Sequence, residues 1–360
     1  MKAIENYLKN ILLKLLLILN PHNEKNKGYL NQNENKILFV RLNRIGDALV
    51  TTPLLHAVKR NIKAKIYILA DRKNYIAYNN NPDIDKLIIF NKGIKGFFEI
   101  RHLVKRENIN TIVDLHDDVS TTVSFLVALA KAQNKFALEK GNKNIYSKTI
   151  KRLDASQFHV VDRLLELAKL FNVKLENANE NIHYYPGEES VNKVERFLSD
   201  AFSNKKFLLG INISAGSKAR FWGTENYKKL IGSLTDFDVN LLLICSPEDL
   251  EDAKKISENK SIIFYSENYN EFAAMISELS FLITPDTAAV HLASAFQVPV
   301  FGIYVKYNTS EMIWSPYKSD FDCVVTEGPT LKNIEFEEVI NKLKPFIEKH
   351  IYSSSNVSRQ

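Results

Sequence analysis

The sequence has very few cysteines. Cys245 and Cys323 are the only two among 360 residues, and each stands beside apolar residues. Small domains that depend on disulfides carry many more and fold in an oxidising compartment. The sequence therefore predicts two reduced core thiols and a cytoplasmic protein.

A long, uncharged apolar run is also absent. Residues 4–19 are rich in Leu and Ile, but Lys9 and Lys14 interrupt them, so no transmembrane span is expected. No small-residue cleavage site for a signal peptide follows. Two interpretations stay open. One is an amphipathic helix on the inner membrane surface, which we favour, and the other is a helix packed on the protein itself.

Nucleic-acid motifs and metal-ligand clusters are missing as well. The net charge of +6 is modest and the Lys and Arg residues are scattered, so we expect contact with phosphates or anionic surfaces and no nucleic acid. No group of His, Cys, Asp and Glu has metal-ligand spacing, so we expect neither a metal nor a cofactor.

Short apolar runs alternate with segments of helical spacing through most of the chain. This alternation predicts an α/β fold with parallel, doubly wound sheets. Tyr185-Pro186-Gly187 interrupts the pattern and is the expected domain boundary. We predict an N-terminal helix and linker over 1–35, α/β domains over 36–186 and 187–330, and a C-terminal helix and tail over 331–360.

The expected strands are the short apolar runs at 37–42, 65–70, 87–90, 111–115, 207–213, 239–245, 261–265, 281–284 and 299–304. The expected helices after the first strand–helix unit lie at 97–104, 121–130, 154–171, 224–234, 270–279, 286–296 and 335–351. Pro345 is expected to kink or break the last one. Polar residues at helix starts predict N-caps at Asp47, Thr224 and Asp286.

Residues 36–60 are the stretch around which the chain is organised. An apolar strand leads into a short loop in which Gly46 can take backbone angles closed to other residues, and then into a helix. Pro53 indicates that this helix kinks or starts late. Asp47 would lie at the carboxyl edge of the sheet, where open α/β folds bind ligands. A helix cap alone would not need Arg44, Thr51 and Thr52 in the same loop.

A second stretch, residues 212–222, has small residues and two cations. After the expected strand come Ser214, Ala215 and Gly216, and then Lys218 and Arg220. Small residues let backbone N–H groups approach a phosphate, and cations offset the charge of a diphosphate leaving group. Trp222 is either a core anchor or a ligand contact.

A third stretch, residues 284–293, starts a helix at Asp286 and Thr287. The free N–H groups and positive dipole end of a helix suit an anion. His291 lies one turn after Thr287 on the same face. A lone His in an apolar helix is more often a core residue, but next to this helix start it is a candidate for a diphosphate.

Together these stretches resemble glycosyltransferase family 9, the heptosyltransferases of the lipopolysaccharide inner core. The series Arg41-Leu42-x-x-Ile45-Gly46-Asp47-x-Leu49-x-Thr51-x-Pro53 resembles the family's N-terminal signature. Residues 212–222 resemble its small-residue loop before a basic residue and Trp-Pro. Asp286-Thr287-Ala288-x-x-His291 resembles its Asp-Thr-Gly-x-x-His signature. Gly223, Ala288 and Val305 depart from the family pattern, which has Pro, Gly and Gly at these positions.

The resemblance implies a GT-B fold, in which two Rossmann-like domains face each other across a cleft, and inverting, metal-independent sugar transfer. It implies Asp47 as the catalytic base, and Lys218, Arg220, Asp286, Thr287, Ala288 and His291 as residues that bind the donor nucleotide sugar. ADP-heptose is the implied donor and a Kdo-lipid A acceptor the implied partner, at the inner membrane surface. Asp249 is the chosen ribose contact, although Glu248 fits equally well. Arg44, Asp114 and His116 are weaker acceptor candidates, and Asp114 and His116 fit a solvated strand end equally well.

Other functions remain open. A family 9 enzyme with another nucleotide sugar is the nearest alternative. A dinucleotide-dependent oxidoreductase fits the fold, but residues 43–47 have one glycine where G-x-G-x-x-G is needed. A non-catalytic nucleotide-sugar or glycan-binding protein would explain the lost glycines, whereas the joint presence of Asp47, Arg220, Asp286 and His291 argues against it.

Overall fold

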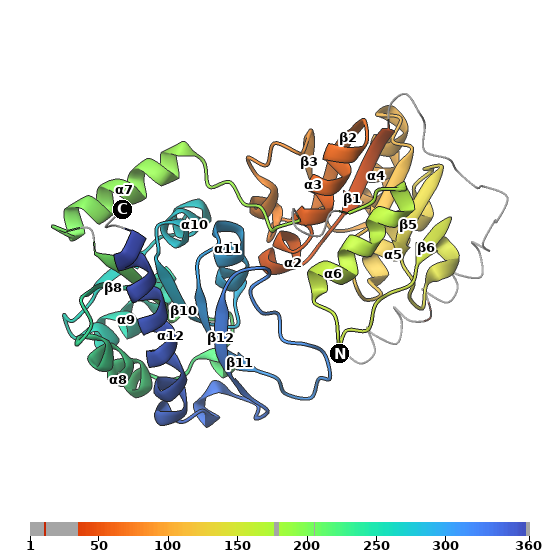
Figure 1. Ribbon diagram of the computed structural model, residues 1–360. Coiled ribbons are helices and arrows are strands. Elements are labelled where there is room, and N and C mark those ends of the chain that lie inside the picture. Colours follow the sequence, from red (N-terminus) through yellow and green to blue (C-terminus); the bar gives the residue numbers. More distant parts are fainter. Residues whose placement is uncertain (1–10, 12–34, 176–179, 205, 358–360) are drawn as a thin grey trace. The chain divides into compact units, whose positions relative to one another are not determined.

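The computed structural model describes Ile11 and residues 35–175, 180–204 and 206–357, which form two compact units, Met1–Glu180 and Asn181–Gln360 (Figure 1). The predicted N-terminal helix, apart from Ile11, lies outside the described residues. Among the described helices, none combines the length and the apolar character needed to cross a membrane.

The first unit is built on a six-stranded parallel sheet in the order β3-β2-β1-β4-β5-β6. Its strands are β1 (Asn35–Val40), β2 (Ala64–Ala70), β3 (Lys86–Ile89), β4 (Thr111–Asp114), β5 (Asn134–Leu138) and β6 (Lys148–Ile150). The chain order reverses between β1 and β4. Loops that follow these two strands therefore diverge to opposite sides, which leaves room for a ligand at their carboxyl ends.

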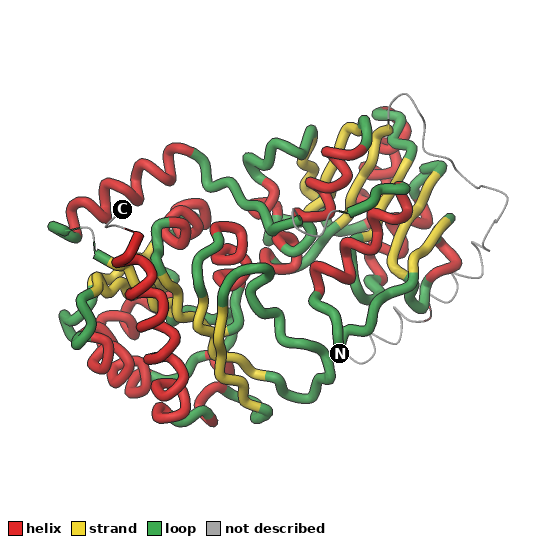
Figure 2. Tube along the Cα trace, in the orientation of Figure 1, coloured by secondary structure: helices red, strands yellow, loops and turns green. Residues whose placement is uncertain are grey.

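Helices cover both faces of this sheet because the strands are apolar on both sides. Leu38 and Val40 of β1 pack with α4 (Ile94–Arg106) and α5 (Thr121–Leu129). The alternate residue Phe39 points to the other face, where its ring meets Phe171 at 6.2 Å. That face carries α3 (Thr52–Asn61), α6 (Val160–Leu165) and η3 (Glu166–Phe171). Figure 2 shows the helices outside the strands in each unit.

The second unit repeats the plan with the parallel order β12-β11-β10-β7-β8-β9. Its strands are β7 (Phe207–Asn212), β8 (Val239–Cys245), β9 (Ile262–Tyr265), β10 (Phe281–Pro285), β11 (Val300–Val305) and β12 (Phe321–Thr326). The helices α8 (Thr224–Leu234), α9 (Leu250–Ser257) and α12 (Phe336–Val357) pack in one core, whereas α7 (Glu188–Ala201), α10 (Tyr269–Ser277) and α11 (Ala288–Phe296) pack with one another. The order reverses between β7 and β10. The predicted fold class is thus confirmed.

The predicted domain boundary at Pro186 lies slightly late. The structure divides the chain between Glu180 and Asn181. Tyr184 already belongs to the second unit, since its hydroxyl hydrogen-bonds Asn270 at 2.5 Å and its ring packs on Phe296.

Three strands, β5, β6 and β12, were not predicted from the sequence. The segment of β5 has three consecutive apolar residues flanked by polar ones, β6 is three residues long, and β12 is an edge strand with one buried residue, Val324. The edge strands β6 and β12 bury too little to show a continuous apolar run, whereas the apolar run of the interior strand β5 is only three residues long. The helix predicted from Asp154 begins instead at Val160. The one predicted from Glu335 runs from Phe336 to Val357 without a break at Pro345.

The N-caps predicted at Asp47, Thr224 and Asp286 are each displaced. Asp47 lies inside α2 (Ile45–Leu49), whose N-cap is Arg44, and α11 is capped by Thr287 rather than Asp286. The helix is interrupted between α2 and α3, and Pro53 lies in the first turn of α3. This agrees with the prediction that the helix starts late. The left-handed backbone in this loop falls on Asn43, with φ 111°, and not on Gly46.

Trp222 is a core anchor of the second unit. It is 1% exposed, its indole N–H donates to the carbonyl of Ile334 at 2.9 Å, and its ring stacks on Phe336. The next residue, Gly223, is the N-cap of α8 in place of the expected Thr224, with φ 111°. Proline cannot adopt this angle, so the departure from the Trp-Pro pattern accompanies a different backbone turn.

Gly223 and Gly232 form a matched pair for measuring how much stability depends on the positive φ in this turn. A methyl group at either would meet nothing within 4 Å, but only Gly223 has a positive φ. We expect Gly223→Ala to lower the free energy of unfolding by about 1–3 kcal/mol. Gly232→Ala, inside α8, should raise it by about 0.5–1 kcal/mol. Tryptophan fluorescence during denaturant unfolding reports on this unit, which holds both tryptophans. Equal effects of the two substitutions would contradict this account.

Candidate active site

In the first unit, Asp47 lies beside the point where the strand order reverses. It is 21% exposed, and its Oδ1 accepts a hydrogen bond from Arg41 Nη2 at 2.5 Å. Arg41 is itself buried and donates through Nη1 to the carbonyl of Leu115, just after β4. One guanidinium therefore orients the carboxylate and joins the ends of β1 and β4.

Thr51 and Thr52 are fully buried and close the break between α2 and α3. The Thr51 hydroxyl donates to Ala48 O and pairs with the Tyr78 hydroxyl, and the Thr52 hydroxyl donates to Leu49 O. Arg44 is exposed at the start of α2. These threonines thus hold the helix that carries Asp47, a role that the sequence pattern did not reveal.

Asp114 and His116 do not form the solvated strand end considered from the sequence. Asp114 is fully buried, and its oxygens accept hydrogen bonds from the His116 ring at 2.8 Å, Lys140 at 2.8 Å and the Tyr146 hydroxyl at 2.6 Å. Both carboxylate oxygens accept hydrogen bonds from groups inside the protein, so a direct contact with an acceptor is not supported for Asp114. The prediction for this residue is corrected to a structural role.

Burial alone would raise the pKa of Asp114, but the Lys140 ammonium and the His116 ring outweigh it and hold the pKa well below its usual range. Burial lowers the pKa of His116 despite the neighbouring carboxylate. The neutral ring donates from Nδ1 to Asp114, and Nε2 accepts from the Leu42 backbone N–H at 3.3 Å. His116 therefore fixes the backbone just before the loop that leads to Asp47, and its predicted contact with an acceptor is replaced by this positioning role.

Lys140 is the cation that balances this buried cluster. It is 5% exposed and also donates to the carbonyl of His116 at 2.7 Å, whereas Lys143 nearby is 59% exposed and pairs with Glu139 on the surface. We expect Lys140→Met to destabilise the first unit by about 3–5 kcal/mol, because it leaves a buried charge without its partner. Lys143→Met should change the stability by less than about 0.5 kcal/mol.

The measurement is amide hydrogen exchange of peptides from β1 and β4, because this unit has no tryptophan. Lost protection in the Lys140 variant alone is the expected pattern. Unchanged protection in that variant would show that Asp114 does not depend on Lys140.

In the second unit, the loops after β7 and β10 are tied together by Asn212. Its Nδ2 donates to Thr284 Oγ1 at 2.9 Å, with longer contacts to Ser214 O and Thr287 Oγ1. Thr287 accepts from the N–H of Ala289 and so caps α11. The start of this nine-residue helix, including Ala288, is thereby fixed at the carboxyl edge of the sheet.

Arg220 makes the second link between these loops. Its Nη1 donates to the Asp286 carbonyl at 2.9 Å, and its Nη2 lies 3.1 Å from Asp286 Oδ2. Lys218 is exposed in the same loop, on η4 (Lys218–Arg220). Arg220 is therefore brought next to the predicted helix start and its positive end, while Lys218 lies exposed in the same loop.

Asp249 extends the cluster to the loop after β8. Its Oδ2 accepts from Ser214 Oγ at 2.5 Å and from Ser246 Oγ at 3.0 Å, while Glu248 is exposed. Burial and the Asp249 charge raise the pKa of the Cys245 thiol to about 12, so this buried thiol is protonated and unreactive at neutral pH. Of the two acidic candidates, Asp249 is the one integrated into the site.

His291 lies one turn into α11 and is 3% exposed, with its ring centroid 5.8 Å from that of Trp314. Trp314 and Lys140 were not predicted from the sequence, and Arg41 and Asn212 were included only as members of motifs without a role. For Arg41 a signal existed, since a charge that ends an apolar strand needs a partner. Within the described part of the chain, no group of His, Cys, Asp and Glu is placed to hold a metal ion.

Comparison with known proteins places these features in context. The family model described as glycosyltransferase family 9 (heptosyltransferase) matches residues 97–344. Lipopolysaccharide heptosyltransferase 3 of Escherichia coli strain K12 is 26% identical over 290 residues, which cover 76% of this chain and 82% of that protein.

Two solved structures share the fold. The glycosyl transferase family 9 protein from Veillonella parvula has a TM-score of 0.75 at 20% identity, over 89% of this chain and 99% of that one. E. coli heptosyltransferase WaaC with ADP has a TM-score of 0.69 at 18% identity, over 88% of this chain and 99% of that one. The two Rossmann-like units therefore correspond to a GT-B fold.

Proposed function

The chain belongs to glycosyltransferase family 9, and we propose that it transfers a heptose from ADP-heptose to the inner core of lipopolysaccharide, with inversion at the anomeric carbon. The observation that carries the proposal is a partly exposed carboxylate, Asp47, oriented by Arg41 at the carboxyl edge of the first sheet. Names of similar proteins support the donor and acceptor, namely a lipopolysaccharide heptosyltransferase and WaaC with ADP.

In the proposed reaction, Asp47 takes the proton from an acceptor hydroxyl while the oxygen of that hydroxyl attacks the anomeric carbon of the donor. The bond from that carbon to the diphosphate oxygen breaks, and ADP leaves with the bonding electrons. Arg220, held in place by Asp286, stabilises the charge that develops on the diphosphate, together with Lys218 and the N-terminus of α11 at Thr287 and Ala288. Asp249 binds the ribose and His291 lines the diphosphate site.

Arg44 is proposed to contact the acceptor, because it is exposed at the start of the helix that carries Asp47. The acceptor is a Kdo sugar on lipid A, so we place the enzyme in the cytoplasm, peripheral to the inner membrane. No step in this mechanism uses a metal.

The base is tested with Asp47→Asn. We expect turnover to fall by roughly 10²–10⁴, the contribution of a general base, with ADP affinity and folding unchanged. The measurement is ADP release from ADP-heptose with and without a Kdo-lipid A acceptor. Asp118→Asn is the control, since this side chain follows β4 and is 84% exposed.

Turnover of the Asp47 variant at the level of the control would remove Asp47 from the mechanism. Absence of ADP release in the unmodified protein would favour another nucleotide sugar. Binding of ADP with no turnover for any nucleotide sugar would instead favour a non-catalytic binding protein.

Arg220 is tested by ADP titration calorimetry. Arg220→Gln removes the charge and should weaken ADP binding about tenfold to a hundredfold, as expected for charge-assisted hydrogen bonds. Arg220→Lys keeps the charge but loses the fork that reaches two atoms of Asp286, so a smaller loss of a few fold is expected. Arg196→Gln, on the exposed side of α7, should leave ADP affinity unchanged. Equal affinities for all variants would exclude Arg220 from the donor site.

A further inference from the structure

The first unit exposes two large apolar side chains on one helix. On α4, Ile94 is 77% exposed and Phe98 is 57% exposed, and the two lie one turn apart. The helix already buries a different side, since Ile100, Leu103 and Val104 pack in the core of the unit. Ile94 and Phe98 thus lie outside the helix face that packs in the core.

The first turn of α4 is rigidly held. A Cβ at Gly96 would lie 1.7 Å from the carbonyl oxygen of Asn91, so the preceding loop packs directly against this turn. From inside, Phe97 contacts Phe90 at 5.6 Å and Phe125 at 6.4 Å between ring centroids. Ile94 and Phe98 therefore project from a closely packed helical turn.

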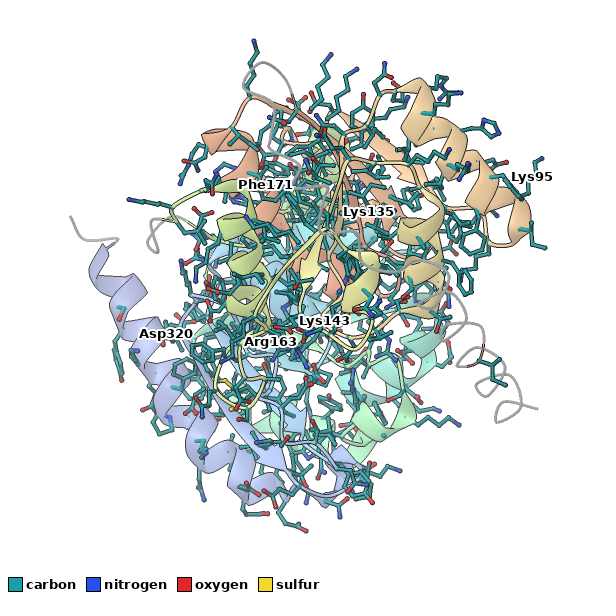
Figure 3. The ribbon with its side chains drawn as sticks, turned by 90° about the vertical axis from the view of Figure 1, so that its right-hand side faces the viewer. Lys95, Lys135, Lys143, Arg163, Phe171 and Asp320 are labelled. Atoms are coloured by element: carbon teal, nitrogen blue, oxygen red, sulfur yellow. The ribbon has the colours of Figure 1, made fainter. Side chains whose placement is uncertain are left out.

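The surroundings of this pair are basic. Between Asn91 and Arg106 the sequence has five Lys and Arg residues and one acid, Glu99. Arg101 and Lys105 continue the side of Ile94 and Phe98 at helical spacing. Lys92 and Lys95 lie at the exposed N-terminal end, and Figure 3 shows Lys95 at the outer edge of the unit. We call the set Ile94, Phe98, Lys92, Lys95, Arg101 and Lys105 the α4 outer face.

The α4 outer face begins on the same edge of the sheet as Asp47. Helix α4 follows β3, and Asp47 follows β1, which runs parallel to β3 through β2. The carboxyl ends of parallel strands share one edge, so the apolar end of α4 lies at the edge that carries the proposed base.

We propose that the α4 outer face binds an anionic lipid surface, with Ile94 and Phe98 inserted at the level of the headgroups and the cations around them paired with lipid phosphates. This inference rests on the proposed function, because it presents a lipid-anchored acceptor to the edge that carries Asp47. The combination of apolar insertion with surrounding positive charge favours a lipid surface over a protein partner or a second copy of the chain.

Vesicle flotation of the full chain tests the proposal. We expect binding to vesicles of phosphatidylcholine mixed with phosphatidylglycerol and much weaker binding to phosphatidylcholine alone. Ile94→Ser/Phe98→Ser should weaken binding about tenfold or more, whereas Tyr352→Ser, a 69% exposed side chain in the second unit, should not. Lys92→Gln/Lys95→Gln/Lys105→Gln should abolish the preference for anionic vesicles. Lys254→Gln/Lys255→Gln/Lys260→Gln removes equal charge from the second unit and should preserve it.

Activity separates this inference from the proposed function. With a de-acylated acceptor in solution, the Ile94/Phe98 double variant should turn over as the unmodified protein does, and it should lose turnover with an acceptor held in vesicles. Vesicle binding tests the lipid-binding role of the α4 outer face even if no sugar transfer is found. The proposal is overturned if the unmodified protein does not bind anionic vesicles or if the double variant binds them equally well. Self-association that the double variant abolishes would assign the face to a second copy instead.

Discussion

The arrangement of both sites depends on one constraint, which is that polar groups at the ends of the central strands must find partners inside the protein. These strands are covered on both faces, so water does not reach them. In the first unit Arg41 and His116 join the ends of β1 and β4. In the second unit Asn212 joins the ends of β7 and β10. The same hydrogen bonds that satisfy buried groups therefore place the loops that carry Asp47, Arg220 and Thr287.

The two units meet this constraint with different chemistry. The first uses a buried carboxylate, Asp114, balanced by Lys140 and bound by His116 and Tyr146. The second uses neutral amide and hydroxyl groups around Asn212, with three charged side chains, Arg220, Asp286 and Asp249, that are partly exposed. A buried charge pair is costly to break, and here the ring that it holds fixes the backbone before the loop that carries Asp47. Partly exposed cations remain accessible to an anionic ligand.

The chain belongs to a glycosyltransferase family, and its two parallel sheets carry polar clusters at their carboxyl edges. The family and the fold thus agree with each other. The departures from the family pattern also acquire physical meaning. Gly223 adopts a φ that proline cannot reach, and Trp222 is occupied with the core rather than with a ligand. These differences alter the turn into α8 while the links from Asn212 and Arg220 hold the loops together.

The sequence by itself determined the alternation of strands and helices, the two-unit plan and the three stretches that converge on the sheet edges. Apolar periodicity and motif spacing are local properties, so they can be read from neighbouring residues. Helix starts, short or edge strands such as β6 and β12, and the left-handed angle at Asn43 were decided only by tertiary structure. So were the inward role of Asp114 and the link from Arg41 to Asp47. These depend on which distant side chain lies nearby, as with Lys140 beside Asp114, and no local pattern encodes that neighbour.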